Sequence, residues 1–169
     1  MATATATIIP PENAIESNLD TDVFIAGGGP AGLAAAIAAR QRGFRVILAD
    51  GSAPPIEKPC GEGLMPETLF ALQKLGVEFD RAESQTFRGI SFLQKNGGVS
   101  ADFPQGTGIG LRRTVLHERL VRRAEESGVR LLWKCPVTGI DGDLVQLSCG
   151  SVRSKWMVGA DGHGSRVRR

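Results

Sequence analysis

Closely spaced glycines near the start of this sequence form the pattern that points most directly to chemistry. The segment reads Gly27-Gly28-Gly29-Pro30-Ala31-Gly32. In such a pattern the first glycine allows a tight turn, the second lets the backbone approach a pyrophosphate, and the third lets a helix pack closely on a sheet. The N-terminus of that helix presents free N–H groups and a positive dipole to the phosphates. All six residues are therefore candidates for binding a dinucleotide; the alternative is a glycine-rich turn without a ligand.

The residues around the glycines supply the elements that this pattern needs. Val23–Ala26 is a short apolar run and predicts a buried parallel strand. Pro30–Arg40 predicts a helix, because proline suits its first turn and alanines dominate it, and Gly43 ends it. Arg45–Asp50 predicts a second buried strand. A glycine pattern that follows a strand and opens a helix inside a βαβ unit has the context of a dinucleotide site.

Asp50 ends the second strand, about 20 residues beyond the glycines. A carboxylate at this place can accept hydrogen bonds from both ribose hydroxyls of an adenosine. An acidic side chain would repel a 2′-phosphate, which disfavours NADP at this site. The alternative is an aspartate that only shapes the turn after a strand.

Arg113 stands at the start of a predicted amphipathic helix, Arg113–Ser127. At 100° per residue it lies in the middle of the apolar stripe formed by Leu116, Leu120 and Ala124. A buried guanidinium needs an acceptor nearby, and phosphate or ribityl oxygens would serve. The alternative is an arginine whose charged end reaches solvent at the end of the helix.

A second candidate turn, Gly159-Ala160-Asp161-Gly162, follows the predicted apolar strand Val152–Val158. Asp161 at a junction between a strand and a helix can cap the helix and order a phosphate-binding turn together with Gly162. A plain turn at the end of a strand is the alternative.

The cysteines and histidines suggest no further site. Cys60, Cys135 and Cys149 are odd in number and lack metal-binding spacing, so we expect reduced thiols, with Cys60 packed in its loop. His117 and His163 have no ligand partners at useful spacing and are expected to be ordinary helix or surface residues. No metal site is expected, and no residue is assigned a catalytic role.

Composition limits the class of protein. The chain has 169 residues, 41% apolar and 22% charged, which suits a single globular domain. Only 5% of residues are aromatic and the net charge is +2, so no nucleic-acid partner is expected. No apolar run approaches the roughly 18 residues of a membrane span, and the N-terminus lacks the features of a signal peptide. We expect a disordered leader over residues 1–20 and a cytoplasmic protein with one domain over residues 21–169.

The remaining elements complete an α/β prediction. They are a helix over Pro66–Leu75, strands Gly89–Leu93 and Val99–Phe103 around an Asn96-Gly97 turn, and strands Val129–Trp133, Val137–Ile140 and Leu144–Leu147. Together with the βαβ unit they predict a three-layer Rossmann-like domain with a parallel sheet, followed by the start of a β-rich region.

Taken together, these residues resemble the class A flavoprotein monooxygenases and their relatives, the geranylgeranyl reductases, over roughly residues 22–169. The matching motifs are Gly27–Gly32 with Asp50, Arg113-x-x-Leu116-x-x-x-Leu120, and Gly159-Ala160-Asp161-Gly162 followed by Ser165-x-Val167-Arg168. The resemblance implies an FAD-type domain in which the glycines and Asp50 hold the ADP part of FAD. It also implies that Arg113 lies near the flavin chain and that Asp161-Gly162 supports the cofactor phosphates and the reductant.

The resemblance further implies an NAD(P)H-dependent monooxygenase that acts through a flavin (hydro)peroxide on a small, hydrophobic or aromatic substrate. The loop Pro59–Pro66 looks closer to the reductase branch, so a prenyl double-bond reductase is an alternative. A non-catalytic FAD- or NAD-binding module is another. The family's later Gly-Asp motif and most of its substrate domain do not occur in this sequence. We therefore expect an incomplete FAD-binding domain that is not a competent enzyme alone.

Overall fold

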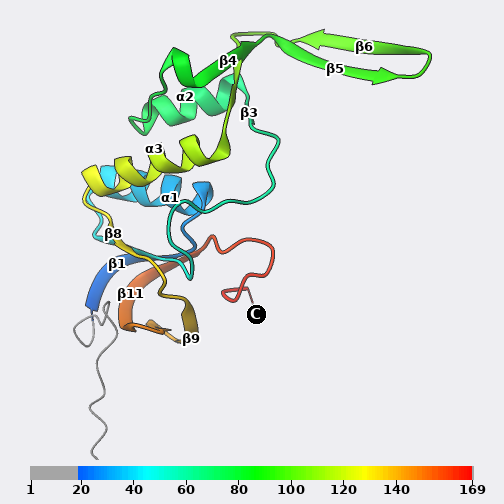
Figure 1. Cartoon of the computed structure of the whole chain (residues 1–169). Helices are drawn as coiled ribbons and strands as arrows, with labels where there is room; N and C mark the ends of the chain where they lie inside the picture. Colours follow the sequence, from blue (N-terminus) through cyan, green and yellow to red (C-terminus); the bar gives the residue numbers. More distant parts are fainter. Residues whose placement is uncertain (1–18, 169) are drawn as a thin grey trace, which may run out of the picture.

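The computed structural model describes residues 19–168, which are built on a six-stranded mixed sheet (Figure 1). In spatial order its strands are β8 (Arg130–Leu132), β2 (Val46–Ala49), β1 (Leu19–Ala26), β11 (Gly150–Gly159), β10 (Leu144–Leu147) and β9 (Val137–Asp141). Strands β8, β2, β1 and β11 run parallel to one another, whereas β10 pairs antiparallel with β11 and β9 pairs antiparallel with β10. Val23 pairs with Val46, so the two strands predicted around the glycine turn are parallel neighbours in one sheet.

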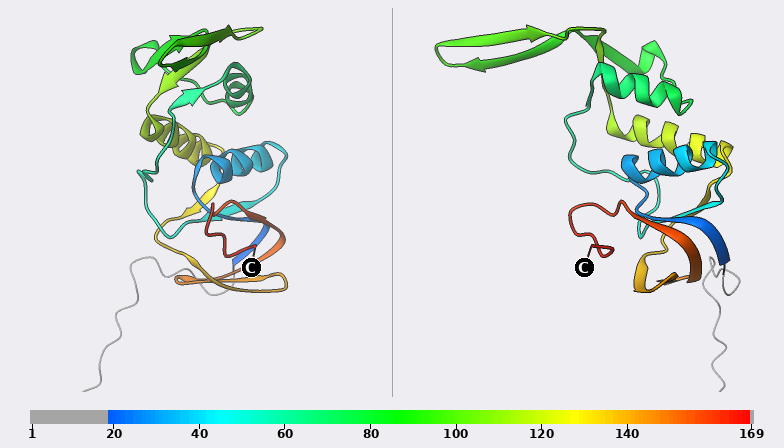
Figure 2. Two further views of the ribbon diagram at one scale, coloured as in Figure 1. Left: turned by 90° about the vertical axis from the view of Figure 1, so that its right-hand side faces the viewer. Right: turned by 180° about the vertical axis from the view of Figure 1, so that it is seen from behind.

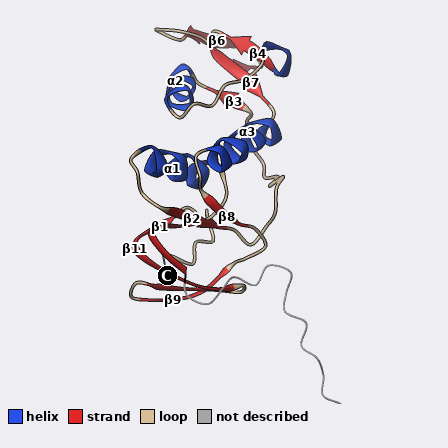
Figure 3. Cartoon of the chain, turned by 90° about the vertical axis from the view of Figure 1, so that its left-hand side faces the viewer, coloured by secondary structure: helices blue, strands red, loops and turns tan. Residues whose placement is uncertain are grey.

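Two helices, α1 (Pro30–Gln41) and α3 (Arg113–Glu126), lie side by side over one face of this sheet (Figures 1 and 3). Side chains alternate along a strand, so Val23 and Ile25 of β1 face the helices. There they pack in one core with Leu33 of α1 and Leu120 of α3. The helix predicted from the alanine-rich stretch thus forms part of the layer that carries the glycine turn.

The opposite face of the sheet has its own core. Phe24 and Ala26 of β1 point to this side and pack with Cys135, Val145 and Val152. Apolar side chains are thus buried on both faces of the sheet. The predicted α/β class with a parallel sheet is confirmed.

The middle of the chain forms a separate layer above the helices (Figure 1). It consists of a small antiparallel sheet of β3 (Gly63–Leu64), β7 (Gly108–Leu111) and β4 (Ser84–Phe87), the helix α2 (Pro66–Lys74) and the 3-10 turn η1 (Arg81–Glu83). From it a hairpin of β5 (Gly89–Gln94) and β6 (Gly97–Asp102) extends away from the rest of the molecule (Figure 2). This hairpin exposes large apolar side chains, namely Phe92, Leu93 and Val99.

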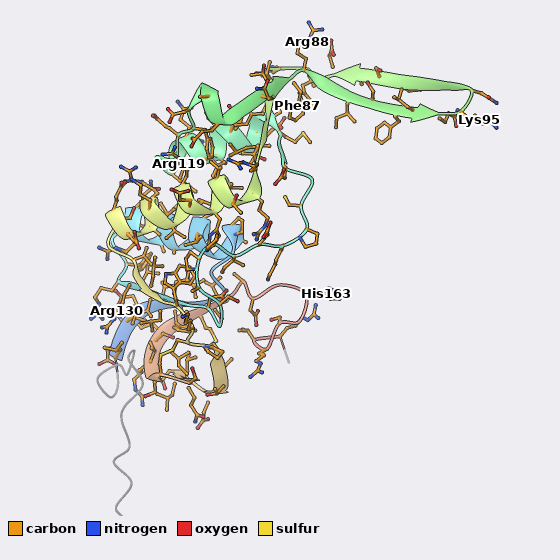
Figure 4. All side chains as sticks on the ribbon, viewed as in Figure 1. Phe87, Arg88, Lys95, Arg119, Arg130 and His163 are labelled. Carbon is orange, nitrogen blue, oxygen red and sulfur yellow. A yellow bond between two sulfur atoms is a disulfide. The ribbon has the colours of Figure 1, made fainter. Side chains whose placement is uncertain are left out.

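The hairpin differs in its turn from the sequence prediction. Gln94 pairs with Gly97, so Lys95 and Asn96 form the loop at the tip and Gly97 already belongs to β6. Figure 4 shows Lys95 at this tip. The position of the turn is set by the register of pairing along the whole β5–β6 hairpin. The Asn-Gly dipeptide alone does not determine that register.

The cysteine prediction was wrong for two residues. Cys135 and Cys149 form a disulfide with their Cα atoms 5.6 Å apart. They lie 14 residues apart in sequence, but β9 and β10 fold back on each other between them. Spacing alone could not show this, because the contact depends on the hairpin. Cys60 is free, as expected, but it is exposed rather than packed in its loop.

Strand β1 begins at Leu19, inside the segment 1–20 that was expected to be a leader; residues 1–18 lie outside the described residues. Across residues 19–168, no helix is long and apolar enough to cross a membrane.

Candidate cofactor site

A cavity of about 250 Å³ opens where β1 and β2 end and the chain turns into α1. Its lining residues are Ala26, Gly27, Gly29, Ala49, Asp50, Gly51, Lys58, Pro136, Val137, Ala160, Asp161, Gly164 and Arg166. The carboxyl ends of parallel strands are where α/β sheets usually bind ligands. The cavity therefore brings together the glycine turn, Asp50 and Asp161, which the sequence had singled out separately.

Three glycines of the turn are required by the protein itself. A Cβ atom on Gly27 would come closer than 3.0 Å to the backbone of Ala160, and one on Gly28 would meet the ring of Trp133 as closely. A Cβ on Gly32 would come closer than 3.0 Å to the carbonyl oxygen of Gly27. These positions fix the turn against the sheet and the helix, whether or not a ligand is bound.

Gly29 is different, because a Cβ atom there would meet nothing within 4 Å. Its backbone, with φ −74° and ψ 177°, suits any residue, and it lines the cavity. Gly29 is also the N-cap of α1, and neither a capping side chain nor an acidic residue in the first turn neutralises this end of the helix. The open space and the positive helix end fit a pyrophosphate that lies directly against the backbone.

Asp50 has a second role besides the expected one. Its Oδ2 accepts a hydrogen bond of 2.7 Å from the N–H of Gly28, and its Oδ1 accepts one of 2.7 Å from the N–H of Ser52. The carboxylate thus orders the glycine turn and the loop after β2. Each oxygen has two lone pairs, so capacity remains for a ribose hydroxyl.

The two carboxylate oxygens of Asp161 differ in their surroundings. Its Oδ2 accepts a hydrogen bond of 2.6 Å from the N–H of Arg166, while its Oδ1 is buried and has no hydrogen-bond partner among residues 19–168. Burial raises the pKa of Asp161, but hydrogen bonds from the Ser165 side chain and the Arg166 backbone outweigh it, so the pKa is lowered. The side chain is therefore an anionic acceptor at neutral pH, which fits a hydroxyl donor of a ligand.

The turn after β11 differs from the expectation in one respect. The sequence suggested that Asp161 caps a following helix, but residues 160–168 form turns and bends. Gly162 adopts a φ of +81°, and a Cβ atom there would lie 3.9 Å from Nζ of Lys58. Gly162 thus lies beside the lysine that lines the cavity rather than in the lining itself.

Arg113 is buried, as its place in the apolar stripe predicted, but it does not line the cavity. Its Nη1 donates to the carbonyl oxygen of Ile56, and its backbone N–H donates to Oε1 of Glu62 at 3.0 Å. The loop after β2 therefore supplies the acceptor that the sequence left open.

His117 is the residue that sequence reasoning missed most clearly. It was expected to be an ordinary residue without a partner, yet its side chain is fully buried and its Nε2 lies 2.8 Å from the carbonyl oxygen of Gly28. The signal was present in the helical periodicity, because His117 falls four residues after Arg113 and three before Leu120. His163, by contrast, is exposed on the C-terminal loop (Figure 4).

Lys58 and Arg166 were also missed, and both bring positive charge to the cavity lining. Lys58 comes from the loop after β2, and Arg166 from the turn that follows Asp161. Neither stands in a pattern with the glycines, so no spacing in the sequence pointed to them.

The buried histidine gives a testable dependence on pH. Burial is the largest cause that lowers the pKa of His117; Arg113 lowers it further, while the hydrogen bond to Gly28 and the charge of Asp50 raise it. The unfolded chain therefore binds a proton more readily than the folded one, and the stability present above pH about 6.5 is lost as the pH falls through the lowered pKa. Urea unfolding should show a smaller free energy of unfolding at mildly acidic pH than at neutral pH. The decline should be weaker in His117→Gln, and equal declines would contradict this assignment.

Comparison with known proteins agrees with this geometry. A family described as "FAD binding domain" matches residues 20–169. Menaquinone reductase of Mycobacterium tuberculosis (strain ATCC 25618 / H37Rv) is 33% identical over 126 residues, which cover 72% of this chain and 31% of the relative. Hispidin-3-hydroxylase of Neonothopanus nambi is 31% identical over 163 residues, covering 87% of this chain and 39% of the relative. The chain thus spans about a third of the length of these curated relatives.

A solved structure also matches over most of the chain. The tetrameric form of 2-methyl-3-hydroxypyridine-5-carboxylic acid oxygenase superposes with a TM-score of 0.75 at 30% identity, covering 89% of this chain and 40% of the oxygenase chain. By their names these relatives are a reductase, a hydroxylase and an oxygenase, which are classes of oxidoreductase, as the sequence resemblance implied. On the match over residues 20–169, the chain belongs to the family of FAD binding domains.

Proposed function

We propose that the cavity at the ends of β1 and β2 holds the ADP part of FAD. The observation that carries this proposal is the space in front of Gly29, which nothing in the protein fills, at the unneutralised N-terminus of α1. The pyrophosphate binds there, with the side chains of Lys58 and Arg166 supplying positive charge from the lining. Asp50 accepts hydrogen bonds from the adenosine ribose while it keeps the glycine turn in place.

The flavin side of the cofactor extends past Asp161 and Gly162. Asp161, which lines the cavity, accepts a hydrogen bond from a hydroxyl of the cofactor. Arg113 acts on the site indirectly, because its contact with Ile56 fixes the loop that carries Lys58. In this proposal the chain binds and orients the cofactor, and no side chain of it acts as an acid, a base or a nucleophile.

For the whole protein we propose an NAD(P)H-dependent monooxygenase that acts on a small hydrophobic or aromatic substrate in the cytoplasm. FAD supplies the redox chemistry when it is bound, since a flavin accepts a hydride from nicotinamide and can react with oxygen. The hydroxylase and the oxygenase among the similar proteins support this class of reaction. Residues 21–169 would form the FAD-binding part of that enzyme, and the parts that bind the substrate are proposed to lie outside this sequence.

A flavin-dependent reductase of a prenyl double bond is the second candidate. Two observations favour it: the Pro59–Pro66 loop, with its exposed Cys60, and the similarity to a menaquinone reductase. Oxygen uptake that depends on substrate and NAD(P)H supports the monooxygenase. Reduction of a prenyl substrate under strict anaerobiosis supports the reductase.

The proposed cofactor site is tested by Gly29→Ala. Alanine fits the backbone and the space at this position, so the free energy of unfolding should change by no more than about 1 kcal/mol. The added methyl group would occupy the place of the pyrophosphate, and FAD affinity, measured by quenching of flavin fluorescence, should fall at least about tenfold, or 1.4 kcal/mol.

Gly110→Ala is the matched control, because Gly110 lies in β7, and a Cβ there makes only an ordinary contact, 3.7 Å from the carbonyl oxygen of Gln85. It should bind FAD as the wild type does. Unchanged FAD affinity in Gly29→Ala would place the pyrophosphate elsewhere. A wild-type chain that does not bind FAD at all would overturn the proposed function.

A further inference from the structure

His117 forms a hydrogen bond with one peptide of the glycine turn, the one between Gly28 and Gly29. It lies in α3, far from the turn in sequence, and its side chain is completely buried. A carbonyl oxygen can only accept, so the 2.8 Å contact with Gly28 requires the proton of the imidazole on Nε2. Its other nitrogen, Nδ1, is buried and has no hydrogen-bond partner among residues 19–168. The contact to Gly28 is therefore the hydrogen bond that orients this ring.

Gly28 is fixed on three sides. Its N–H donates to Oδ2 of Asp50 at 2.7 Å, and its carbonyl oxygen accepts from His117. The ring of Trp133 fills the space where a side chain would stand, and it lies 6.3 Å from the His117 ring between centroids. Gly27 and Gly29, on either side of Gly28, line the cavity. Gly28 does not line it and packs against Trp133 instead.

The direction of the Gly28 carbonyl also decides the direction of the next N–H. The carbonyl of Gly28 and the N–H of Gly29 belong to the same peptide unit, which is planar and trans, so they point to opposite sides. Because the carbonyl of Gly28 points toward His117 in α3, the N–H of Gly29 points away from α3. No backbone acceptor for it is found within the described part of the chain.

We propose that His117 is a positioning residue for the pyrophosphate of FAD: it locks the Gly28–Gly29 peptide so that the N–H of Gly29 points at the phosphate. This inference rests on the proposed function of the cavity. Part of the affinity for FAD then depends on His117, a buried residue of α3, and not on the glycine pattern alone. His117 touches neither cofactor nor substrate and acts only through Gly28.

Two substitutions separate positioning from packing. Glutamine places an amide N–H near the position of Nε2 and can donate to Gly28, whereas leucine fills much of the same space without a donor. FAD affinity of the full chain should fall about tenfold in His117→Leu, which corresponds to one lost hydrogen bond. In His117→Gln, which keeps a donor, the affinity should stay within about threefold of the wild type. Riboflavin, which lacks the pyrophosphate, serves as a second probe, and its affinity should be equal in all three proteins.

A measurement on the wild-type protein keeps the proposal testable if His117→Leu fails to fold. In ¹⁵N-resolved NMR spectra, saturating FAD should shift the amide resonance of Gly29 more than that of Gly28, whose N–H is already held by Asp50. A Gly29 resonance that does not move at saturation overturns the role of His117, and so does wild-type affinity in a folded His117→Leu. Absence of FAD binding in the wild type overturns the proposed function itself, and this inference with it.

Discussion

Gly32→Ala should destabilise the fold by about 3 kcal/mol. Alanine is the better helix former by about 1 kcal/mol, and this gain would normally make the substitution favourable inside a helix. Here the added Cβ would come closer than 3.0 Å to the carbonyl oxygen of Gly27, which is backbone and cannot rotate away. Either the turn or the contact between α1 and the sheet has to open. Urea unfolding followed by circular dichroism measures the loss.

Gly29→Ala provides the comparison, since the same chemical change three residues earlier meets nothing within 4 Å. The two variants should separate the functions of the turn: Gly32→Ala loses stability, and Gly29→Ala loses flavin affinity while it keeps stability. Equal stability of the two proteins would show that the close approach of α1 to the turn is not what requires glycine at position 32.

Loss of the disulfide should have a similarly large effect. Cys135 and Cys149 close a loop with a sequence separation of 14, and a cross-link over such a loop contributes about 3 kcal/mol, mainly by restricting the unfolded chain. Cys149→Ser is the preferred variant, because Cys135 is fully buried and a serine hydroxyl there would add a cost of its own. Under non-reducing conditions, Cys149→Ser should therefore unfold at a lower urea concentration than the wild type.

A dithiol reductant should bring the wild type to the stability of Cys149→Ser, because it removes the same bond. Cys60→Ser is the matched control, since Cys60 is exposed and unpaired, and its stability should be that of the wild type with and without reductant. A wild-type midpoint that does not respond to reductant would contradict a stabilising disulfide. The effect should also reach the cofactor site, because Pro136 and Val137 line the cavity directly after Cys135.

The sequence predicted the βαβ unit and the helix at Arg113 because these features are local. The glycines, the alanines of α1 and the apolar stripe of α3 each specify one element through its own residues. The structure adds that Asp50 and the turn at Asp161 share one cavity with the glycines, because both follow strands that are parallel neighbours of β1.

What the sequence could not predict depends on contacts between distant segments. The bond from His117 to Gly28 joins residues 89 positions apart, and the acceptor of Arg113 lies 57 positions away at Ile56. A histidine in an amphipathic helix is compatible with either a surface or a core, and only the packing of α3 against the glycine turn decides between them. The pairing of Cys135 with Cys149 follows the same rule, because the paired strands β9 and β10 bring the two residues together.

The central position of β11 has a consequence for the order in which the protein is made. Strand β1 pairs along its length with β11, from Leu19 opposite Val152 to Ala26 opposite Gly159. A ribosome releases β1 and α1 long before β11, so during synthesis β1 keeps one open edge. Gly27 packs against the backbone of Ala160, which is also synthesised later than β1 and α1. The glycine turn is therefore not completed until β11 and Ala160 have been made, and we expect the proposed flavin to bind only after translation has passed them.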